Sequence, residues 1–274
     1  MSKFQRIYWI KKFDWKHYSR LYNKYCKLKN NYYSLSSSKL VRCVKLTKDA
    51  KIVDMACGTG VMTSQLLKKY PKFSIFAIDL SKEMLAYYQK NFRDQIKKGQ
   101  IKAVHGNAEQ INRYTSEKYD VVFIASAFWD LEIEIMLKNV SKILNKNGIF
   151  AFNLPALITG NERGFMFFIE HFFRKALNSK MIYRRISEER LKKLFRKYKF
   201  QSVLSKKYSF RVSKPNVAQF FDLLRYRYPF IFFPKEIPYN KKLKRCTEIF
   251  NESLKYIPKD GINEVGFVFV IKKK

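Results

Sequence analysis

The sequence has few acidic residues, few histidines and few cysteines. Among its 274 residues, 56 are Lys or Arg, 22 are Asp or Glu, three are His and four are Cys. The cysteines form no C-x-x-C pair, so the sequence shows neither a zinc-binding spacing nor the pattern of a disulfide framework. We therefore predict a protein without a metal in a reducing, cytoplasmic environment.

Long apolar segments are also missing. The two longest aromatic runs, FMFFIEHFF at 165–173 and YPFIFFP at 228–234, are far shorter than the roughly 20 residues that a membrane-spanning helix needs. The basic N-terminal stretch lacks the apolar segment of a signal peptide. These absences favour a cytoplasmic location and leave peripheral association with a membrane open.

The charge balance is strongly basic. The formal net charge is +34 and the isoelectric point is about 10.0. Such a charge attracts anionic partners, which include nucleic acid, anionic lipid headgroups and acidic proteins. Lys far outnumbers Arg, however, and Ile, Asn, Tyr and Phe are abundant, as an AT-rich genome would also produce. Composition leaves both interpretations open.

From residue 51 onward, short apolar strands alternate with helices. The expected strands are 51–56, 73–80, 101–107, 119–128 and 149–155, and the expected helices among them are 60–70, 81–92 and 132–145, with N-cap Ser81 for the second and Gly148 closing the third. A further helix at 187–200, capped by Ser187, precedes strands at 201–212 and 264–274. This alternation predicts the α/β class with a doubly wound, Rossmann-like sheet.

Changes of pattern divide the chain into segments. We expect an amphipathic helical cap at 1–48, a ligand-binding core at 49–155 and the C-terminal part of that core at 187–274. Two insertions rich in Phe, Tyr and Lys lie at 156–186 and at about 213–262. Ligands of open α/β sheets bind beyond the carboxyl ends of the strands, so insertions on that side would form a lid.

The stretch KIVDMACGTGVMTSQLL, residues 51–67, passes from an apolar strand into small residues and then into a helix. Small residues in such a turn let the backbone approach a ligand and adopt positive φ, and the N–H groups of the helix then face the ligand's polar atoms. Asp79, at the end of the next strand, is placed to accept hydrogen bonds from ribose hydroxyls. The turn therefore predicts a cofactor that contains a nucleoside.

Two residues narrow the choice of cofactor. The G-x-G-x-x-G fingerprint of dinucleotide binding requires a glycine where this chain has Thr63. Asp54 stands before the turn, and its carboxylate would repel a pyrophosphate but attract an ammonium or a sulfonium. The pattern points away from NAD and toward S-adenosylmethionine.

The same residues resemble a known family. VDMACGTG resembles the first motif of the class I S-adenosylmethionine-dependent methyltransferases, of the small-molecule, type 11-like branch, with Ala56 in place of the usual first glycine. AIDLSKEML, HGNAEQI, YDVVFIASAFWDL and LNKNGIFAFNLP look like the later strand motifs, so the resemblance covers roughly residues 45–154. It implies a seven-stranded sheet, mostly parallel with an antiparallel last strand, plus helical lid insertions.

The resemblance also implies roles for individual residues. Asp54 would orient the turn or reach the methionine ammonium through water, Asp79 would hold the ribose hydroxyls, and Leu80 would pack on the adenine. The remaining contacts would come from Ala56, Cys57, Gly58 and Gly60 to the methionine part, from Asn107 and Ala108 to the adenine edge, and from Ala125 and Ser126 near the sulfonium. At position 107 the family more often has Asp, and both side chains can accept from an adenine amino group.

The sequence defines the acceptor site less well. The methyl group of a sulfonium is already activated, so the enzyme chiefly aligns the reactants and excludes water, and only a phenol or an amine would gain from a base. Tyr18 and Tyr22 lie one helical turn apart in the N-terminal segment, Trp129 follows the fourth strand, and His171 lies in the first insertion. We take these four as candidate catalytic residues, although two tyrosines at i and i+4 are also the spacing of simple packing.

The two insertions bear on the nature of the acceptor. Their aromatic residues would form a lid for a long acyl, prenyl or polyketide chain, or else the core of extra helices. A basic rim would dock an acidic acyl carrier protein or an anionic membrane surface. RNA methylation is an alternative, disfavoured because no N-P-P-Y-type tetrad follows the fourth strand. A non-catalytic binding protein that keeps the fold is the remaining hypothesis.

Overall fold

The computed structural model describes residues 13–159, 164–178 and 185–274. Residues 1–12 of the predicted cap, and 160–163 and 179–184 of the first predicted insertion, lie outside the described residues. Within the described ranges, the structure holds no helix that combines the length and the apolar character needed to cross a membrane.

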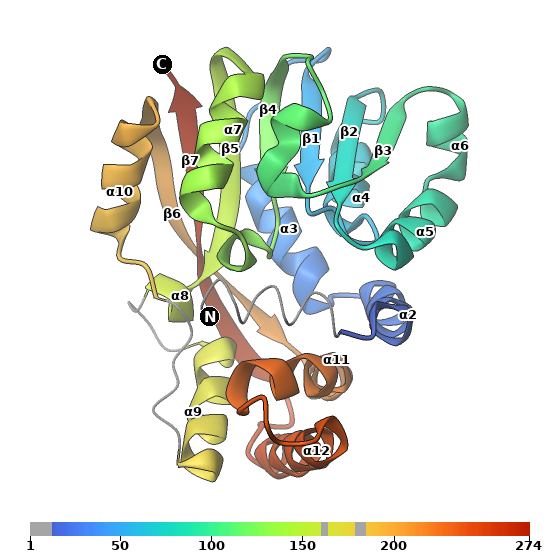
Figure 1. The fold of residues 1–274 in the computed structure, drawn as a ribbon, viewed down its shortest axis with the longest axis vertical. Coiled ribbons are helices and arrows are strands. Elements are labelled where there is room, and N and C mark those ends of the chain that lie inside the picture. Colours follow the sequence, from blue (N-terminus) through green and yellow to red (C-terminus); the bar gives the residue numbers. More distant parts are fainter. Residues whose placement is uncertain (1–12, 160–163, 179–184) are drawn as a thin grey trace. The chain divides into compact units, whose positions relative to one another are not determined.

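A mixed seven-stranded sheet organises the chain, in the order β3-β2-β1-β4-β5-β7-β6 (Figure 1). The strands are β1 (Lys51–Met55), β2 (Ser74–Asp79), β3 (Ile101–His105), β4 (Tyr119–Ile124), β5 (Leu144–Pro155), β6 (Phe200–Val212) and β7 (Ile262–Lys273). The pairs from β3 to β5 are parallel, and the arrow of β7 points opposite to that of β1 in Figure 1. The predicted fold class is confirmed.

The helices fill the connections between the strands. Those before β5 are α2 (Trp15–Cys26), α3 (Tyr32–Arg42), α4 (Val61–Lys69), α5 (Lys82–Asn91), α6 (Arg93–Lys97) and α7 (Ile133–Ile143), with short 3-10 turns η1 (Ala108–Arg113) and η2 (Phe128–Asp130). Those after β5 are α8 (Ala156–Thr159), α9 (Phe165–Leu177), α10 (Glu188–Lys197), α11 (Lys214–Phe232) and α12 (Tyr239–Lys255). The predicted N-caps are confirmed: Ser81 Oγ accepts from Met84 N and Ser187 Oγ accepts from Arg190 N.

Two compact units can be recognised from the contacts. The sheet unit comprises residues 33–154, 186–208 and 266–274, and the helical unit comprises the described parts of 1–32, 155–185 and 209–265. In the sheet unit, β1 is buried except for Lys51 and pairs with β2 and β4. A strand buried on both faces must be apolar along its whole length, which explains the sequence KIVDM apart from its acid.

The helical unit has an aromatic core. Phe173 on α9 packs against Tyr228 of α11 and Phe250 of α12, with ring centroids 4.8 Å apart in both pairs. Phe165 stacks on Phe221 at 6.0 Å. Much of the aromatic content of the two insertions is therefore the core of extra helices, one of the two interpretations that the sequence left open.

One expected boundary is wrong. Gly148 does not close the helix that follows β4, because α7 ends at Ile143 and Gly148 lies within β5. Leu144 already pairs with Tyr119, and the register then shifts before Ile149 pairs with Val121. The intervening residues form an irregularity that includes Asn147 at a φ of 67°, so the glycine marks a break in the ladder rather than the end of a helix.

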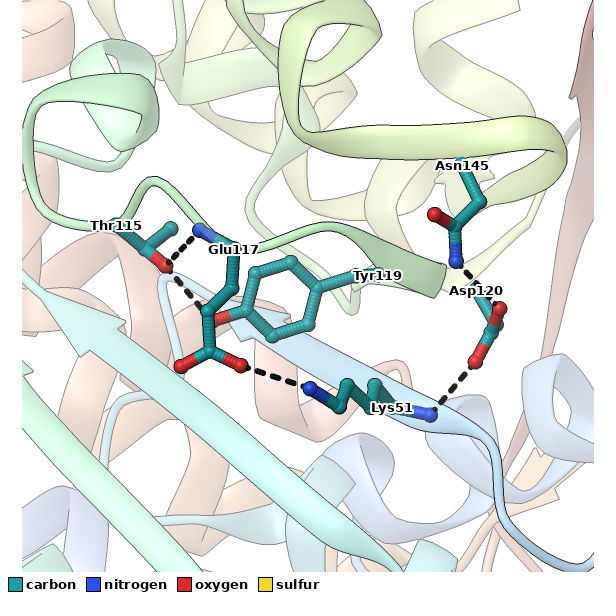
Figure 2. Close-up of polar contacts among 6 residues, drawn as sticks. All are labelled: Lys51, Thr115, Glu117, Tyr119, Asp120 and Asn145. Atoms are coloured by element: carbon teal, nitrogen blue, oxygen red, sulfur yellow. Dashed lines mark hydrogen bonds and ion pairs between the residues drawn. The ribbon is translucent and has the colours of Figure 1, made fainter.

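Polar side chains tie the strands together at their amino ends (Figure 2). Asp120 accepts hydrogen bonds from the backbone N–H of Lys51 at 2.9 Å and from Asn145 Nδ2 at 2.7 Å. Lys51 Nζ lies 3.0 Å from Glu117 Oε2, and Thr115 Oγ1 lies 3.0 Å from the hydroxyl of Tyr119. This network joins β1, β4 and β5 at the amino ends of the strands, the edge of the sheet opposite to the glycine-rich turn.

Candidate functional site

The turn between β1 and α4 has an unusual backbone. Ala56, Gly58 and Gly60 all have positive φ, at 53°, 55° and 96°. The turn is held to the neighbouring strand because Cys57 N donates to Ile78 O at 3.1 Å. A Cβ on Gly60 would lie 2.1 Å from the ring of Phe92, so this glycine is also required by the packing of the turn on the end of α5.

Asp54, in β1, connects the strand to the first turn of α4. Its Oδ2 accepts from the backbone N–H of Thr63 at 3.1 Å and from the Thr63 hydroxyl at 2.7 Å. Thr63 Oγ1 also lies 2.9 Å from the hydroxyl of Tyr88 on α5. Since Thr63 lies in the first turn of α4, the carboxylate already occupies the end of the helix where an anion would otherwise bind.

Burial raises the pKa of Asp54 from 3.8 to about 7, and the nearby charge of Asp79 acts in the same direction, while the two hydrogen bonds from Thr63 oppose the shift. A cationic ligand nearby would favour the ionised form of this carboxyl. The site therefore suits a ligand that brings positive charge.

Asp79, the last residue of β2, is the second carboxylate. Its Oδ2 accepts from Gly58 N at 2.8 Å and its Oδ1 accepts from Ser81 N at 2.9 Å. Burial raises its pKa, and these N–H groups limit the rise. Only 8% of the residue is exposed, so the carboxylate is fixed in one orientation, with lone pairs left on both oxygens for further donors.

The residues after β2 and β3 lie in different environments. Leu80 is 40% exposed, and its carbonyl lies 2.9 Å from Nε2 of His105. Asn107 caps η1, because its Oδ1 accepts from Glu109 N at 3.0 Å, and Ala108 is buried. An exposed leucine beside a fixed carboxylate offers an apolar face next to a hydrogen-bond acceptor, as a nucleoside requires.

A buried polar cluster lies beyond β4 and β5. Asn153 Oδ1 accepts from Ser126 N at 2.8 Å, which holds Ser126 at a φ of 55°. Asn153 Nδ2 donates to Ser36 Oγ and, at 3.3 Å, to the hydroxyl of Tyr208. Ser36 Oγ in turn lies 3.3 Å from Ser126 Oγ. Because Ser126 alone among the four is half-exposed, the cluster positions its hydroxyl at the surface of the site.

The structure brings the eleven predicted cofactor residues to one edge of the sheet unit. They lie in the last two residues of β1 or β2 or in the segments that follow β1, β2, β3 and β4, which are adjacent and parallel. The four candidate catalytic residues are divided between the units. Tyr18 and Tyr22 pack together on α2 with ring centroids 6.0 Å apart, His171 is exposed on α9, and Trp129 lies in η2 of the sheet unit.

Several residues of this edge were not expected from the sequence. Tyr88 supports Asp54 through Thr63, and Ser36, Asn153 and Tyr208 form the polar cluster. Asn153 could have been found, because it is the one polar side chain in the apolar run IFAFNLP. Within the described ranges, no group of three or more His, Cys, Asp or Glu side chains is arranged to hold a metal ion.

A comparison with known protein families matches residues 52–148 to a methyltransferase domain. A curated relative from Bacillus cereus, a malonyl-[acyl-carrier protein] O-methyltransferase, is 32% identical over 109 residues, which are 39% of this chain and 38% of that relative. The chain thus spans about two fifths of the length of the curated relatives that it matches.

Solved structures share the fold over most of the chain. A Haemonchus contortus phosphoethanolamine N-methyltransferase 2, in complex with phosphomonomethylethanolamine and S-adenosylhomocysteine, is similar with a TM-score of 0.52 and 15% identity, over 87% of this chain and 52% of that one. The [4+2]-cyclase SpnF is similar with a TM-score of 0.61 and 13% identity, over 93% of this chain and 91% of that one. At these identities the likeness concerns the fold.

Proposed function

We propose that this chain is a class I S-adenosylmethionine-dependent methyltransferase, because residues 52–148 match a methyltransferase domain, and that it transfers a methyl group from S-adenosylmethionine to a small apolar or acyl-like acceptor. The observation that carries the proposal is the hydrogen bonding of two buried carboxylates: Asp54 accepts from Thr63 in the first turn of α4, and Asp79 accepts from Gly58 in the turn between β1 and α4. This turn lies between strands β2 and β4, at the edge where ligands of such sheets bind.

The residues of this edge fit the cofactor. Asp54 already accepts from the first turn of α4, which disfavours a pyrophosphate there and favours an ammonium or a sulfonium. Asp79 retains acceptor capacity for the ribose hydroxyls, and exposed Leu80 would cover the adenine. S-adenosylmethionine would supply a methyl group on a positively charged sulfur, which needs alignment more than activation.

The chain's own residues would orient the reactants and exclude water. Ser126, fixed by Asn153, presents a hydroxyl that can donate to the acceptor or order it. Trp129 in η2 is half-exposed three residues further on, where it can cover the acceptor. We assign no general base, because a carboxylate or enolate acceptor needs none.

We propose an acyl chain, tethered to a carrier protein, as the preferred acceptor. Curated relatives that match about two fifths of this chain bear the name malonyl-[acyl-carrier protein] O-methyltransferase. The formal charge of +34 complements an acidic carrier protein and would steer its approach. The cytoplasmic location that the sequence favours is part of the same proposal.

Two alternatives are kept as outcomes of the test. The basic charge would also serve an RNA methyltransferase, for which binding should fall steeply with salt. A non-catalytic binding protein that keeps the fold is the other, since fold alone does not determine chemistry.

The direct experiment is methyl transfer from radiolabelled S-adenosylmethionine to three acceptors: a malonyl-loaded acyl carrier protein, a free malonyl thioester and total RNA. We expect label on the carrier-bound malonyl group, and less on the free thioester. Label on RNA would show that RNA, and not an acyl group, is the acceptor. Binding of S-adenosylhomocysteine with no transfer to any of the three acceptors would favour the non-catalytic alternative. Asp79→Ala should abolish transfer, whereas the matched control Asp120→Ala, which removes a carboxylate with two similar partners at the opposite edge, should not.

A further inference from the structure

A cavity lies within the helical unit, and none of the eleven predicted cofactor residues lines it. Its volume is about 570 Å³, within the range of 300–1,000 Å³ that is typical of small-molecule sites. It is bounded by the first half of α9, the end of β6, the loop before β7 and the beginning of β7. All of these segments belong to the helical unit.

The lining combines apolar surface with hydrogen-bond donors. The apolar part comes from Phe167, Phe168, Pro258 and Ile262, and the polar side chains are His171, Arg211 and Asn263. Asn263 Oδ1 faces Arg211 Nη1 at 3.4 Å, so the amide group that Asn263 can offer a ligand is its NH₂ donor. The cavity therefore presents a guanidinium, an amide donor and an imidazole to its contents.

Arg211 is held rigidly. Its Nε donates to Asp260 O at 3.0 Å and its Nη2 donates to Gly261 O at 3.1 Å, while Nη2 also pairs with the carboxylate of Asp260. Because Asp260 already offsets part of the charge, the site suits a monoanion rather than a dianion. A guanidinium fixed by several bonds loses little freedom when it binds a ligand.

The wall behind the cavity does not oppose a negative charge. Glu264 is fully buried, and its Oε2 accepts from Met166 N in the first turn of α9 at 3.1 Å. Burial raises the pKa of Glu264 to about 8, which lessens its negative charge near pH 7.

An aromatic surface continues from the cavity. The ring of Phe168 lies 4.8 Å from that of Phe172, and the ring of Phe172 lies 5.2 Å from that of Tyr256. Because Tyr256 is 62% exposed, this series of rings reaches the protein surface. An apolar chain that leaves the cavity could pack against the rings instead of entering water.

We propose that this cavity binds an amphiphilic monocarboxylate, with the carboxylate on Arg211 and Asn263 and the aliphatic chain along Phe168 and its neighbouring rings. The proposal is independent of the proposed methyl transfer, because no predicted cofactor residue lines the cavity. Binding can therefore be measured without S-adenosylmethionine. His171, one of the four candidate catalytic residues, would then contact this carboxylate ligand instead of the methyl acceptor.

The test is a titration of the full chain with decanoate below its micelle concentration, with 1-decanol and acetate as comparison ligands. The readout is the ring-proton NMR signals of the three histidines, because only His171 lines the cavity. We expect the His171 signal to shift with decanoate, with the signals of His17 and His105 unchanged, and we expect decanoate to bind about ten-fold more tightly than decanol. Equal shifts of all three signals would show nonspecific binding to a basic protein and overturn the proposal.

Two variants of one ion pair separate ligand recognition from loop stability. Arg211→Gln and Asp260→Asn both break the pair, so any loosening of the loop is common to them. We expect Arg211→Gln to weaken decanoate binding about ten-fold and Asp260→Asn to strengthen it, since the second change frees the guanidinium charge. Weaker binding in both variants would contradict the proposal, and so would an equal loss in the control Lys175→Gln, which removes a positive charge from α9 outside the cavity lining.

Discussion

Asp54 and Thr63 are joined by two hydrogen bonds, one from the backbone N–H and one from the hydroxyl of the threonine, and both end on the same carboxylate oxygen. The position at which a dinucleotide-binding turn would have glycine thus carries a side chain that secures a carboxylate. The carboxylate of Asp54 therefore occupies the N-terminal end of α4, where a dinucleotide-binding protein would bind the pyrophosphate.

Thr63→Val tests the side-chain half of this link. The variant keeps the shape and the backbone donor but removes the hydroxyl, which leaves Asp54 Oδ2 and the Tyr88 hydroxyl without it. We expect a loss of about 1–3 kcal/mol in the free energy of unfolding, measured with urea, because the partners are buried. Thr115→Val, at the opposite edge of the sheet, should cost less and leave cofactor affinity unchanged; an equal effect of both on cofactor affinity would contradict the assignment.

Ala56→Gly should stabilise the protein. Ala56 has a φ of 53°, and a left-handed conformation costs a residue with a Cβ roughly 1–2 kcal/mol. Glycine removes this strain but loses about 0.5–1 kcal/mol more in chain entropy on folding. We expect a net gain of about 0.5 kcal/mol in urea unfolding. Ala77→Gly, in extended and buried β2, is the matched control and should destabilise; a loss at both positions would show that Ala56 is not strained.

The pH dependence of stability should reveal Asp54. Burial raises its pKa from 3.8 in the ordinary case to about 7, so between these values the folded state binds more protons at this group than the unfolded chain. The free energy of unfolding should therefore fall as the pH rises through that window, and level off above it. Asp54→Asn removes this titrating group. The decrease of the unfolding free energy with pH should therefore be smaller in the variant than in the wild type. Glu264, whose pKa is also raised, acts in both proteins and cancels in the difference.

Asn153→Ala tests the polar cluster. The change removes the acceptor for Ser126 N and the donors to Ser36 and Tyr208. We expect a loss of about 2–4 kcal/mol in unfolding free energy, because buried partners are left unsatisfied and a cavity forms. A positioning role also predicts a lower kcat for methyl transfer in Ser126→Ala at unchanged stability, and an unchanged kcat there would limit the cluster to a structural role.

The sequence predicted the parts of the site that are close together along the chain. The turn, Asp54 and Asp79 each follow from a strand end and a short motif, and the parallel order of the strands brings them to one edge. The link between Ser36 and Asn153 joins residues 117 positions apart, so only the folded chain reveals it. The prediction that Gly148 ends a helix is wrong: glycine commonly ends helices, but here the pairing of Leu144 with Tyr119 begins strand β5 four residues earlier.

The acceptor residues were harder to predict for a different reason. The predicted cofactor contacts rely on backbone geometry that a short motif encodes, whereas the predicted acceptor contacts come from single side chains without such a motif. Tyr18 illustrates the difficulty, because it is buried and its ring lies 4.9 Å from that of Phe13, which is a core environment. Its role in catalysis stays a prediction.

Calorimetric titration with S-adenosylhomocysteine and, separately, with NAD tests most directly whether the turn holds a sulfur nucleoside. Wild type and Asp120→Ala should bind S-adenosylhomocysteine alike, Asp79→Ala should bind it at least about ten-fold more weakly, and NAD should give no binding heat. Urea unfolding of both variants establishes beforehand that they are folded at the titration temperature. Binding of NAD to the wild-type chain, or no binding of S-adenosylhomocysteine at millimolar concentration, would contradict the proposed cofactor site.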